Sequence, residues 1–363
     1  MFGGGEIWML RTLHGLAQRG HSVALLCRPG TDLGKRARRS GIRTFQFSVR
    51  GDFGPLTVLR TARLLRQEKI QIALTNMDKE FRFVTLAAQL IQSCAVIPRR
   101  GVDYPLKNQL HYRLTYEKWA SKIVANSRAT KQALLRNAPW LPADQIQVIY
   151  NGIDPEPFLT MEKFNGHLGF GRSCGVRSIG FVGQLDERKG IDTLLQAFRL
   201  TAQSFSDVDL WLAGEGPLRP YIEKFSNDHQ LKDRIHLLGY IENVPDFMKS
   251  IDLLALPSLW EGFGIVLIEA MAAGKPVVTT NTSSMPEIVL DRITGCIVPV
   301  NDVGALDHAF QEILNDADLA KIWGENGRNR VMEQFTIDHM LDQFEDLFAA
   351  TWNEYCEKRT GRE

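Results

Sequence analysis

Two runs of alternating helices and short apolar strands constrain this 363-residue chain more than any other feature of its sequence. In the first run the strands are SVALLC, TFQFSV, IQIALTN, AVIP and KIVANS. In the second run they are SIGFVGQL, VDLWLAG, IHLLGY, DLLALPS and KPVVTTN. Strands that alternate with amphipathic helices form parallel, doubly wound sheets. The chain is therefore predicted to be an α/β protein.

The alternation lapses once, in the stretch PEPFLTMEKFNGHLGFGRSCGVRS at 155–178, which is rich in Gly, Pro and polar residues. We interpret this stretch as a linker, because a chain of this length exceeds one ordinary core. The predicted domains are residues 1–165 and 166–335, two Rossmann-like domains that face a cleft. A final helix, 336–363, is expected to pack back towards the first domain.

The chain begins with MFGGGEIW, a Gly-rich turn that leads directly into a helix. A doubly wound domain is expected to have a strand before such a turn. The first strand of the amino-terminal domain is therefore expected to be missing, which puts the stability of that domain in doubt.

The charge is distributed unevenly. Residues 1–160 contain 24 Lys and Arg against 11 Asp and Glu, whereas residues 161–363 contain 19 against 31. This asymmetry indicates an anionic partner for the basic half: a membrane surface, a phosphorylated acceptor or nucleic acid. Nucleic acid ranks last, because the sequence has no zinc-finger spacing, aromatic-studded basic strand or helix-turn-helix signal.

The cysteines and the apolar runs indicate the cellular compartment in which the protein is expected. Five cysteines lie far apart with no CxxC pair, so we expect reduced, mostly buried thiols in a cytosolic protein. No apolar run approaches 18 residues, and no charged-then-apolar leader marks a secretion signal.

Three loops at strand ends of the second half carry residues suited to phosphate and sugar: GFVGQLDERKG, LAGEGPL and PSLWEGFG. Lys189 and the helix amino terminus at Gly264 suit an anion, and Glu261 can accept hydrogen bonds from sugar hydroxyls. Glu269 lies among apolar residues in GIVLIEAMAAG. It either reaches a fixed internal donor or faces a pocket that a ligand fills.

The spacing E-x7-E from Glu261 to Glu269, followed by A-x-A-x-G-x-P-V-V, resembles the signature of family 4 glycosyltransferases, retaining enzymes of the GT-B fold. Further matches are GGGE at 3–6, RGHSV at 19–23, NGID at 151–154, VGQLDERKG at 182–190 and LAGEGPL at 212–218. Each match is weak alone, but their order and spacing cover almost the whole chain.

The resemblance implies roles for individual residues. Glu269 would bind the ribose hydroxyls of the nucleotide, and Lys189 would contact the donor diphosphate. Glu261 would contact the donor sugar near its reacting carbon. Arg100, in VIPRRGVDYP, would stand near the place where many family members carry a His. The implied catalytic residues are Glu261, Lys189 and Arg100. The implied donor-binding residues are Gly4, Gly5, Gly183, Arg188, Lys189, Gly239, Tyr240, Glu261, Gly262, Phe263, Gly264 and Glu269.

Besides Arg100, a second position departs from the family pattern. Many members have Arg after the turn glycine, paired with the lysine on the diphosphate, whereas this chain has Gln184. Arg188 lies beside Lys189, but its side chain is expected to point elsewhere.

The resemblance implies transfer of a hexosyl group from a nucleotide-diphosphate sugar to an acceptor hydroxyl, without metal or cofactor. The expected acceptor is a glycan or lipid-linked molecule of cell-envelope polysaccharide or lipopolysaccharide synthesis, reached from the cytoplasmic face of the membrane. Two alternatives stay open: a sugar-nucleotide epimerase or hydrolase on the same fold, and a non-catalytic nucleotide-sugar-binding protein.

Overall fold

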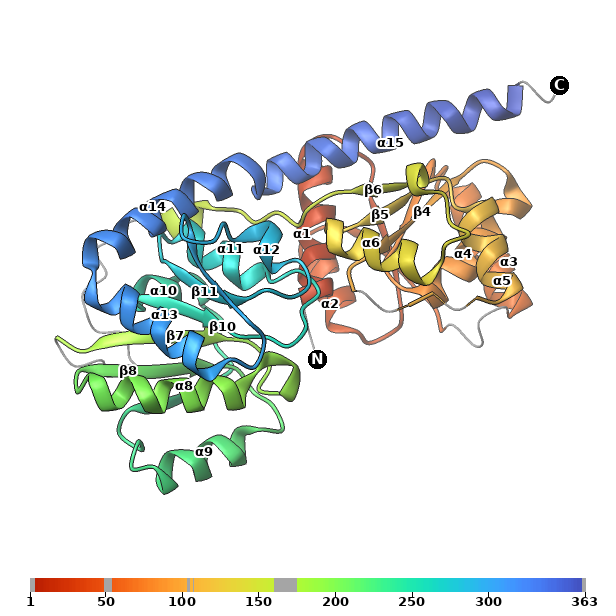
Figure 1. Cartoon of the computed structure of the whole chain (residues 1–363). Coiled ribbons are helices and arrows are strands. Elements are labelled where there is room, and N and C mark those ends of the chain that lie inside the picture. The colour runs from red at the N-terminus through yellow and green to blue at the C-terminus, as the bar shows by residue number, and fades with distance from the viewer. Residues whose placement is uncertain (1–3, 49–53, 103–104, 107, 160–174, 361–363) are drawn as a thin grey trace. The chain divides into compact units, whose positions relative to one another are not determined.

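The computed structural model describes residues 4–48, 54–102, 105–106, 108–159 and 175–360 (Figure 1). The chain divides into two compact units. The first consists of Met1–Gly152 together with Ile337–Glu363, and the second of Ile153–Thr336. Most of the predicted linker lies in residues 160–174, outside the described residues. Both units are α/β with parallel sheets, as the sequence predicted.

The first unit begins with a helix and ends with one. Its elements are α1 (Gly4–Gln18), β1 (Ala24–Cys27), α2 (Asp32–Arg39), β2 (Arg43–Gln46), α3 (Pro55–Gln67), β3 (Ile72–Thr75), α4 (Asp78–Ile91), β4 (Ala95–Arg100), α5 (Leu110–Arg113), the π-helix η1 (Leu114–Trp119), β5 (Ile123–Ala125), α6 (Arg128–Asn137), the 3₁₀ helix η2 (Ala143–Gln145), β6 (Ile146–Val148) and α15 (Ile337–Thr360).

The strands of the first unit form two sheets, in the orders β1-β2 and β3-β4-β5-β6, with all pairs parallel. Among the described elements no strand precedes α1, and no ladder joins β1 to β3. The two sheets therefore share a unit without sharing hydrogen bonds along their edges.

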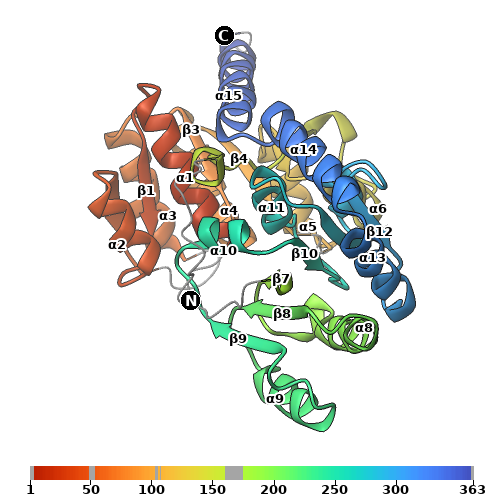
Figure 2. The ribbon, with the colours of Figure 1, turned by 90° about the vertical axis from the view of Figure 1, so that its left-hand side faces the viewer.

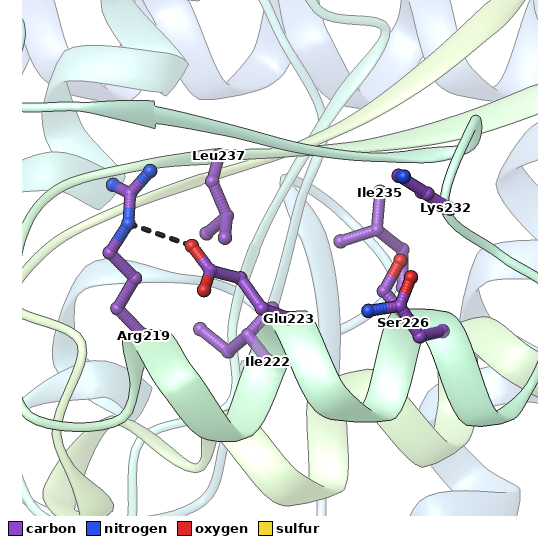
Figure 3. Close-up of a pocket in the computed structure, with 8 residues that line it drawn as sticks. Arg219, Ile222, Glu223, Ser226, Lys232, Ile235 and Leu237 are labelled. Carbon is purple, nitrogen blue, oxygen red and sulfur yellow. Dashed lines mark hydrogen bonds and ion pairs between the residues drawn. The ribbon is translucent and has the colours of Figure 1, made fainter.

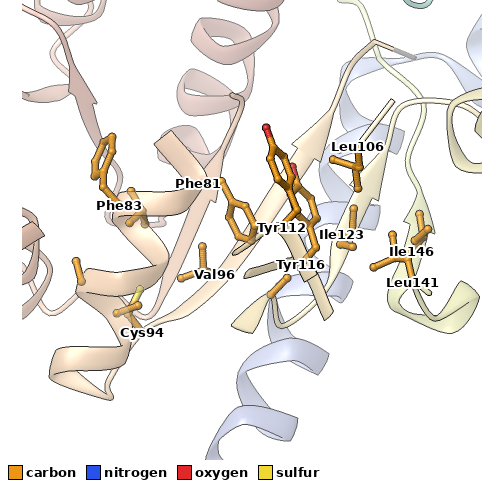
Figure 4. Packing of buried hydrophobic residues seen from close by; sticks show 14 of the residues in the cluster. Phe81, Phe83, Cys94, Val96, Leu106, Tyr112, Tyr116, Ile123, Leu141 and Ile146 are labelled. Atoms are coloured by element: carbon orange, nitrogen blue, oxygen red, sulfur yellow. The ribbon is translucent and has the colours of Figure 1, made fainter. Parts of the chain in front are cut away.

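Helices cover these sheets in two groups. α3 and α4 pack together, and their apolar side chains join an apolar cluster with Tyr116, Ile123 and Ile146, part of which Figure 4 shows. In this cluster Phe81 packs against Tyr116 with ring centroids 4.6 Å apart. The other group contains α1, α2 and α15, whose side chains form separate clusters.

α15 belongs to the first unit although it follows the second in sequence. Trp8 of α1 donates a hydrogen bond to Met340 Sδ at 3.2 Å and packs against Phe344 with centroids 5.8 Å apart. Arg19 pairs with Glu345 at 2.7 Å. This helix thus completes the apolar cover of α1.

The second unit contains one six-stranded sheet. Its elements are α7 (Glu156–Leu159), β7 (Arg177–Val182), η3 (Glu187–Lys189), α8 (Ile191–Ser204), β8 (Val208–Ala213), α9 (Arg219–Asp228), β9 (Ile235–Gly239), α10 (Val244–Ser250), β10 (Leu253–Leu256), α11 (Ile265–Ala272), β11 (Val277–Thr280), α12 (Met285–Ile288), β12 (Gly295–Val298), α13 (Val303–Asn315) and α14 (Ala317–Gln334).

The strand order of this sheet is β12-β11-β10-β7-β8-β9, and Figure 2 shows β7, β8 and β9 in succession. From β7 the chain proceeds outward to β9 and then returns to place β10 on the other side of β7. The order therefore reverses between β7 and β10. In open parallel sheets, ligands bind at the carboxyl ends of the strands beside such a reversal.

The cysteines fit the prediction of free thiols and supply a first test. Cys94 and Cys296 are buried, and burial raises their pKa to about 12 and about 11, whereas Cys27 and Cys356 are half-buried. Cys174 lies outside the described residues.

We expect an alkylating reagent at pH 8 to label Cys27 and Cys356 in the folded protein. Cys94 and Cys296 should react only after denaturation, because the thiolate is the reactive form and their raised pKa values keep them protonated. Peptide mass spectrometry measures this, and early labelling of Cys94 would contradict it.

Candidate active site

Lys189 and Glu261 form an ion pair at the strand-order reversal of the second unit. Lys189 ends η3 in the loop after β7, and Glu261 lies in the loop after β10. Their side chains are only 13% and 16% exposed, and Ser258 Oγ lies 3.3 Å from Glu261 Oε2. The sequence predicted that both residues belong to one site, but it did not predict that they bond to each other.

Close backbone packing fixes Lys189 in place. Gly190 has φ +65°, and a Cβ there would lie 2.0 Å from the carbonyl oxygen of Pro257. Leu259 N donates to the Arg188 carbonyl at 2.8 Å. Only glycine permits this approach, so the loop that carries Lys189 is held against the loop that leads to Glu261.

Hydroxyl groups from the neighbouring strand hold the loop that carries Glu261. Thr280 Oγ1 donates to the Ser258 carbonyl at 2.6 Å, and Ser284 Oγ donates to the Phe263 carbonyl at 2.9 Å. The Glu261 backbone N–H donates to Ser283 Oγ at 3.3 Å. Ser284 stands at the N-cap of α12 without a side-chain cap hydrogen bond, so its hydroxyl is available to this loop. The hydroxyl-rich run TTNTSS at 279–284 is the sequence feature that could have indicated these hydrogen bonds.

The glycines at the ends of β7, β8 and β9 lie close together. A Cβ on Gly214 would lie 1.8 Å from the Gly183 carbonyl oxygen, and Gly214 N donates to the Gly239 carbonyl at 2.7 Å. Tyr240 follows Gly239 and is 67% exposed. The predicted positions Gly183, Gly239 and Tyr240 therefore share one edge of the sheet with Lys189.

Glu269 lies on α11, whose neighbouring residues Leu267, Ile268 and Ala270 are buried. Glu269 itself is half-buried rather than enclosed in the core. The apolar sequence around it overstated its burial, because the helix has one side that the core does not cover.

Gly264 begins α11 in the left-handed conformation, with φ +83° and no side-chain cap. Phe263 before it is 3% exposed, and its ring lies 6.2 Å from Phe335. Gly262 is half-buried. The expected amino-terminal turn of α11 thus follows Glu261 by only a few residues.

The side chain of Arg188 contacts residues of its own loop and Trp260. Its guanidinium pairs with Asp186 at 2.6 Å, lies 3.4 Å from Gln184 Oε1 and sits 5.7 Å from the ring of Trp260. These contacts place the guanidinium of Arg188 beside the amide of Gln184.

Arg100 ends β4 in the first unit and is 6% exposed. It forms an ion pair with Asp78, and the hydroxyl of Tyr116 donates to the same carboxylate. Burial raises the pKa of Tyr116, so the phenol stays protonated as a donor. This arrangement favours a structural role for Arg100 over the predicted role beside a donor sugar.

Gly4 and Gly5 are exposed and form the first turn of α1 rather than a separate loop, while Gly3 lies outside the described residues.

Arg99, which precedes Arg100 at the end of β4, was not among the predicted site residues. Its guanidinium donates to Asn76 and Asn151 at 2.8 Å each and lies 3.7 Å from the Trp8 ring. Burial lowers the pKa of Arg99 to about 9, since both of these acceptors are neutral amides.

A shallow surface hollow lies elsewhere in the second unit, between α9 and β9. Figure 3 shows Arg219 and Glu223 of α9 opposite Leu237 of β9. None of the predicted site residues lines it. Among the described residues there is no group of three or more His, Cys, Asp and Glu arranged to hold a metal ion.

Two family models match the chain. The model for Glycosyltransferase Family 4 matches residues 2–157, and the model for Glycosyl transferases group 1 matches residues 175–330. The two matches together leave out only short stretches, and the second includes Lys189, Glu261 and Glu269.

Curated relatives and solved structures agree with these models. The chain is 29% identical to the uncharacterized glycosyltransferase MJ1607 of Methanocaldococcus jannaschii over 66% of this chain and 62% of that one, less than two thirds of the relative's length. It is 27% identical to an Escherichia coli UDP-Gal:alpha-D-GlcNAc-diphosphoundecaprenol alpha-1,3-galactosyltransferase, over 79% and 77%. The crystal structure of Anabaena Alr3699/HepE in complex with UDP superposes with TM-score 0.85 at 20% identity, covering 96% of this chain and 97% of that one. At 20% identity, this structural match shows a shared fold.

Proposed function

Because the chain belongs to glycosyltransferase family 4, we propose that it transfers a hexosyl group from a nucleotide-diphosphate sugar to an acceptor hydroxyl with retention of configuration. The ion pair of Lys189 and Glu261, placed where the strand order reverses, is the observation that carries this proposal. It joins one cation and one carboxylate in the part of the sheet where ligands bind.

Lys189 supplies the charge that the reaction requires. Its ammonium group has three donors. The carboxylate of Glu261 takes one and sets the direction of the others, which leaves donors for a diphosphate. As the glycosidic bond breaks, charge grows on the leaving diphosphate, and a fixed cation stabilises that charge more than it stabilises the bound substrate.

Glu261 and Glu269 would bind two other parts of the donor, its sugar and its ribose. Glu261 orients the donor sugar from the loop that the hydroxyls of Thr280 and Ser284 hold in place. Glu269, half-buried on α11, accepts hydrogen bonds from the ribose hydroxyls. The acceptor attacks the same face of the sugar, and an oxygen of the leaving phosphate takes its proton. No metal or cofactor takes part in this proposal.

The proposed acceptor is a glycan or lipid-linked molecule of envelope polysaccharide or lipopolysaccharide synthesis, reached from the cytoplasmic face of the membrane. The Escherichia coli relative is named for an acceptor linked to diphosphoundecaprenol, which supports this class. Among the described residues no helix combines the length and hydropathy needed to cross a bilayer.

Glu269→Ala tests the nucleotide site. We expect UDP or another nucleoside diphosphate at about 100 times its Kd to stabilise the wild-type protein by about 2.7 kcal/mol. The variant should lose most of this shift, because the ribose hydroxyls lose their acceptor. Thermal denaturation with UDP, GDP, ADP and their hexose conjugates measures the effect.

Glu325→Ala is the matched control, since Glu325 is an exposed glutamate on α14 of the same unit. An equal shift in wild type and Glu269→Ala would remove Glu269 from the nucleotide site. Turnover of a sugar nucleotide without any acceptor would indicate a hydrolase instead, and proton NMR of the product's anomeric centre would report retention or inversion.

A further inference from the structure

We propose that the outward face of α3 is a docking surface for an anionic lipid bilayer. The inference rests on the proposed function, because a lipid-linked acceptor would be presented at such a surface. It goes further by naming the element that makes the contact. We call this surface the α3 face: Leu56, Leu59, Arg60, Arg63 and Arg66.

The leucines of the α3 face are not required by the core. Val58, Ala62 and Leu65 already supply the inward side of α3, and they are buried in the cluster that Figure 4 shows in part. Leu56 and Leu59 are 61% and 60% exposed. The helix therefore has apolar residues on two sides, and only one side has an apolar partner within the described structure.

The charge on the α3 face has one sign. Arg60, Arg63 and Arg66 are exposed, and α3 contains no acidic residue. Within the described part of the chain these arginines form no ion pair. The nearby carboxylate of Glu68, which caps the end of α3, is paired with Arg43 at 2.7 Å. Positive charge on the α3 face is thus left for a partner outside the described structure.

The spacing places these side chains on one stripe. Leu56, Leu59, Arg60 and Arg63 stand at i, i+3, i+4 and i+7, which is one side of an α-helix. Leucines beside arginines suit the interfacial region of a bilayer, where apolar side chains enter the acyl boundary and guanidinium groups pair with lipid phosphates. Charge complementarity therefore selects an anionic membrane. Nucleic acid would use the arginines but would leave both leucines in water.

Vesicle binding tests the proposal without any sugar nucleotide. Flotation with vesicles of one third phosphatidylglycerol and two thirds phosphatidylcholine should retain the wild-type protein, and pure phosphatidylcholine should not. We expect Arg60→Gln with Arg63→Gln to weaken binding to the anionic vesicles about 30-fold, since each arginine near such a surface contributes about fivefold. Leu56→Ser with Leu59→Ser should weaken it by about tenfold or more.

Matched controls separate the α3 face from diffuse charge. Arg38→Gln with Arg39→Gln removes the same charge from exposed positions on α2, which packs on α1, whereas α3 packs on α4 (Figure 2). Ile322→Ser with Met332→Ser removes exposed apolar residues from α14. Both control pairs should bind vesicles within about twofold of wild type.

Three results would overturn the proposal: no wild-type binding to the anionic vesicles, an equal loss in the α2 pair, or binding to soluble heparin that matches vesicle binding and ignores the leucines. The thermal shift by nucleotide should stay unchanged in the α3 variants. Loss of that shift in wild type would instead reject the proposed function and leave the vesicle result standing.

Discussion

Lys189→Ala is expected to lower the rate of sugar transfer by about 10²–10³-fold, the effect of removing one fixed donor from a developing anion. Lys189 is 13% exposed and is held by Glu261 and by the loop packing at Gly190. A cation with so little freedom loses little order when the transition state forms. The loss should appear in kcat more than in KM, because the charge on the leaving group grows during the reaction.

Steady-state transfer assays at saturating donor measure this effect. Lys224→Ala is the matched control, because Lys224 is exposed on α9 of the same unit. The variant also leaves Glu261 without its cation, so its thermal stability is measured in parallel. A loss of less than about threefold in a folded variant would remove Lys189 from the reaction.

Arg100→Met is expected to lower the free energy of unfolding by about 3 kcal/mol, the lower end for breaking a buried ion pair. The lower end applies because the Asp78 side chain is 31% exposed, whereas that of Arg100 is 7% exposed. The change leaves a carboxylate beside the phenol of Tyr116 with no cation to balance it. Chemical denaturation followed by fluorescence or circular dichroism measures the effect.

The same variant separates two roles for Arg100. If Arg100 has a structural role, we expect a large loss of stability. The turnover rate should then stay within about threefold of wild type at a temperature where the variant is folded. The control variant Arg136→Met changes an exposed arginine on α6, and it should lower neither the stability nor the turnover rate. If turnover instead fell by about 100-fold or more in a variant with wild-type stability, the catalytic role that the sequence suggested would be restored.

The sequence predicted the elements well because their signal is local. The apolar strands named from the sequence follow from residues close together in the chain, and the structure forms strands at those places, whereas α6 and β6 were not predicted. Lys189 and Glu261 were placed on one edge because parallel strands share their carboxyl ends.

The missed features depend on pairs of residues far apart in sequence. The bond between Lys189 and Glu261 joins loops 72 residues apart, and that between Thr280 and Ser258 joins neighbouring strands. Asp78 and Tyr116 likewise reach Arg100 from other elements. Periodicity carries no information on such pairs. The partial exposure of Glu269 depends likewise on which side of α11 is covered, and tertiary packing decides that.

The position of α15 has a consequence for the order in which the protein is made. Trp8 and Met340 lie 332 residues apart, and the whole second unit separates them. During synthesis, residues 153–336 leave the ribosome before the helix that covers α1. The second unit can fold while the first waits with the apolar side of α1 uncovered. Contacts of such long separation form late and leave apolar surface open to wrong partners. The α1 side of the first unit is therefore the last part of that unit to be covered.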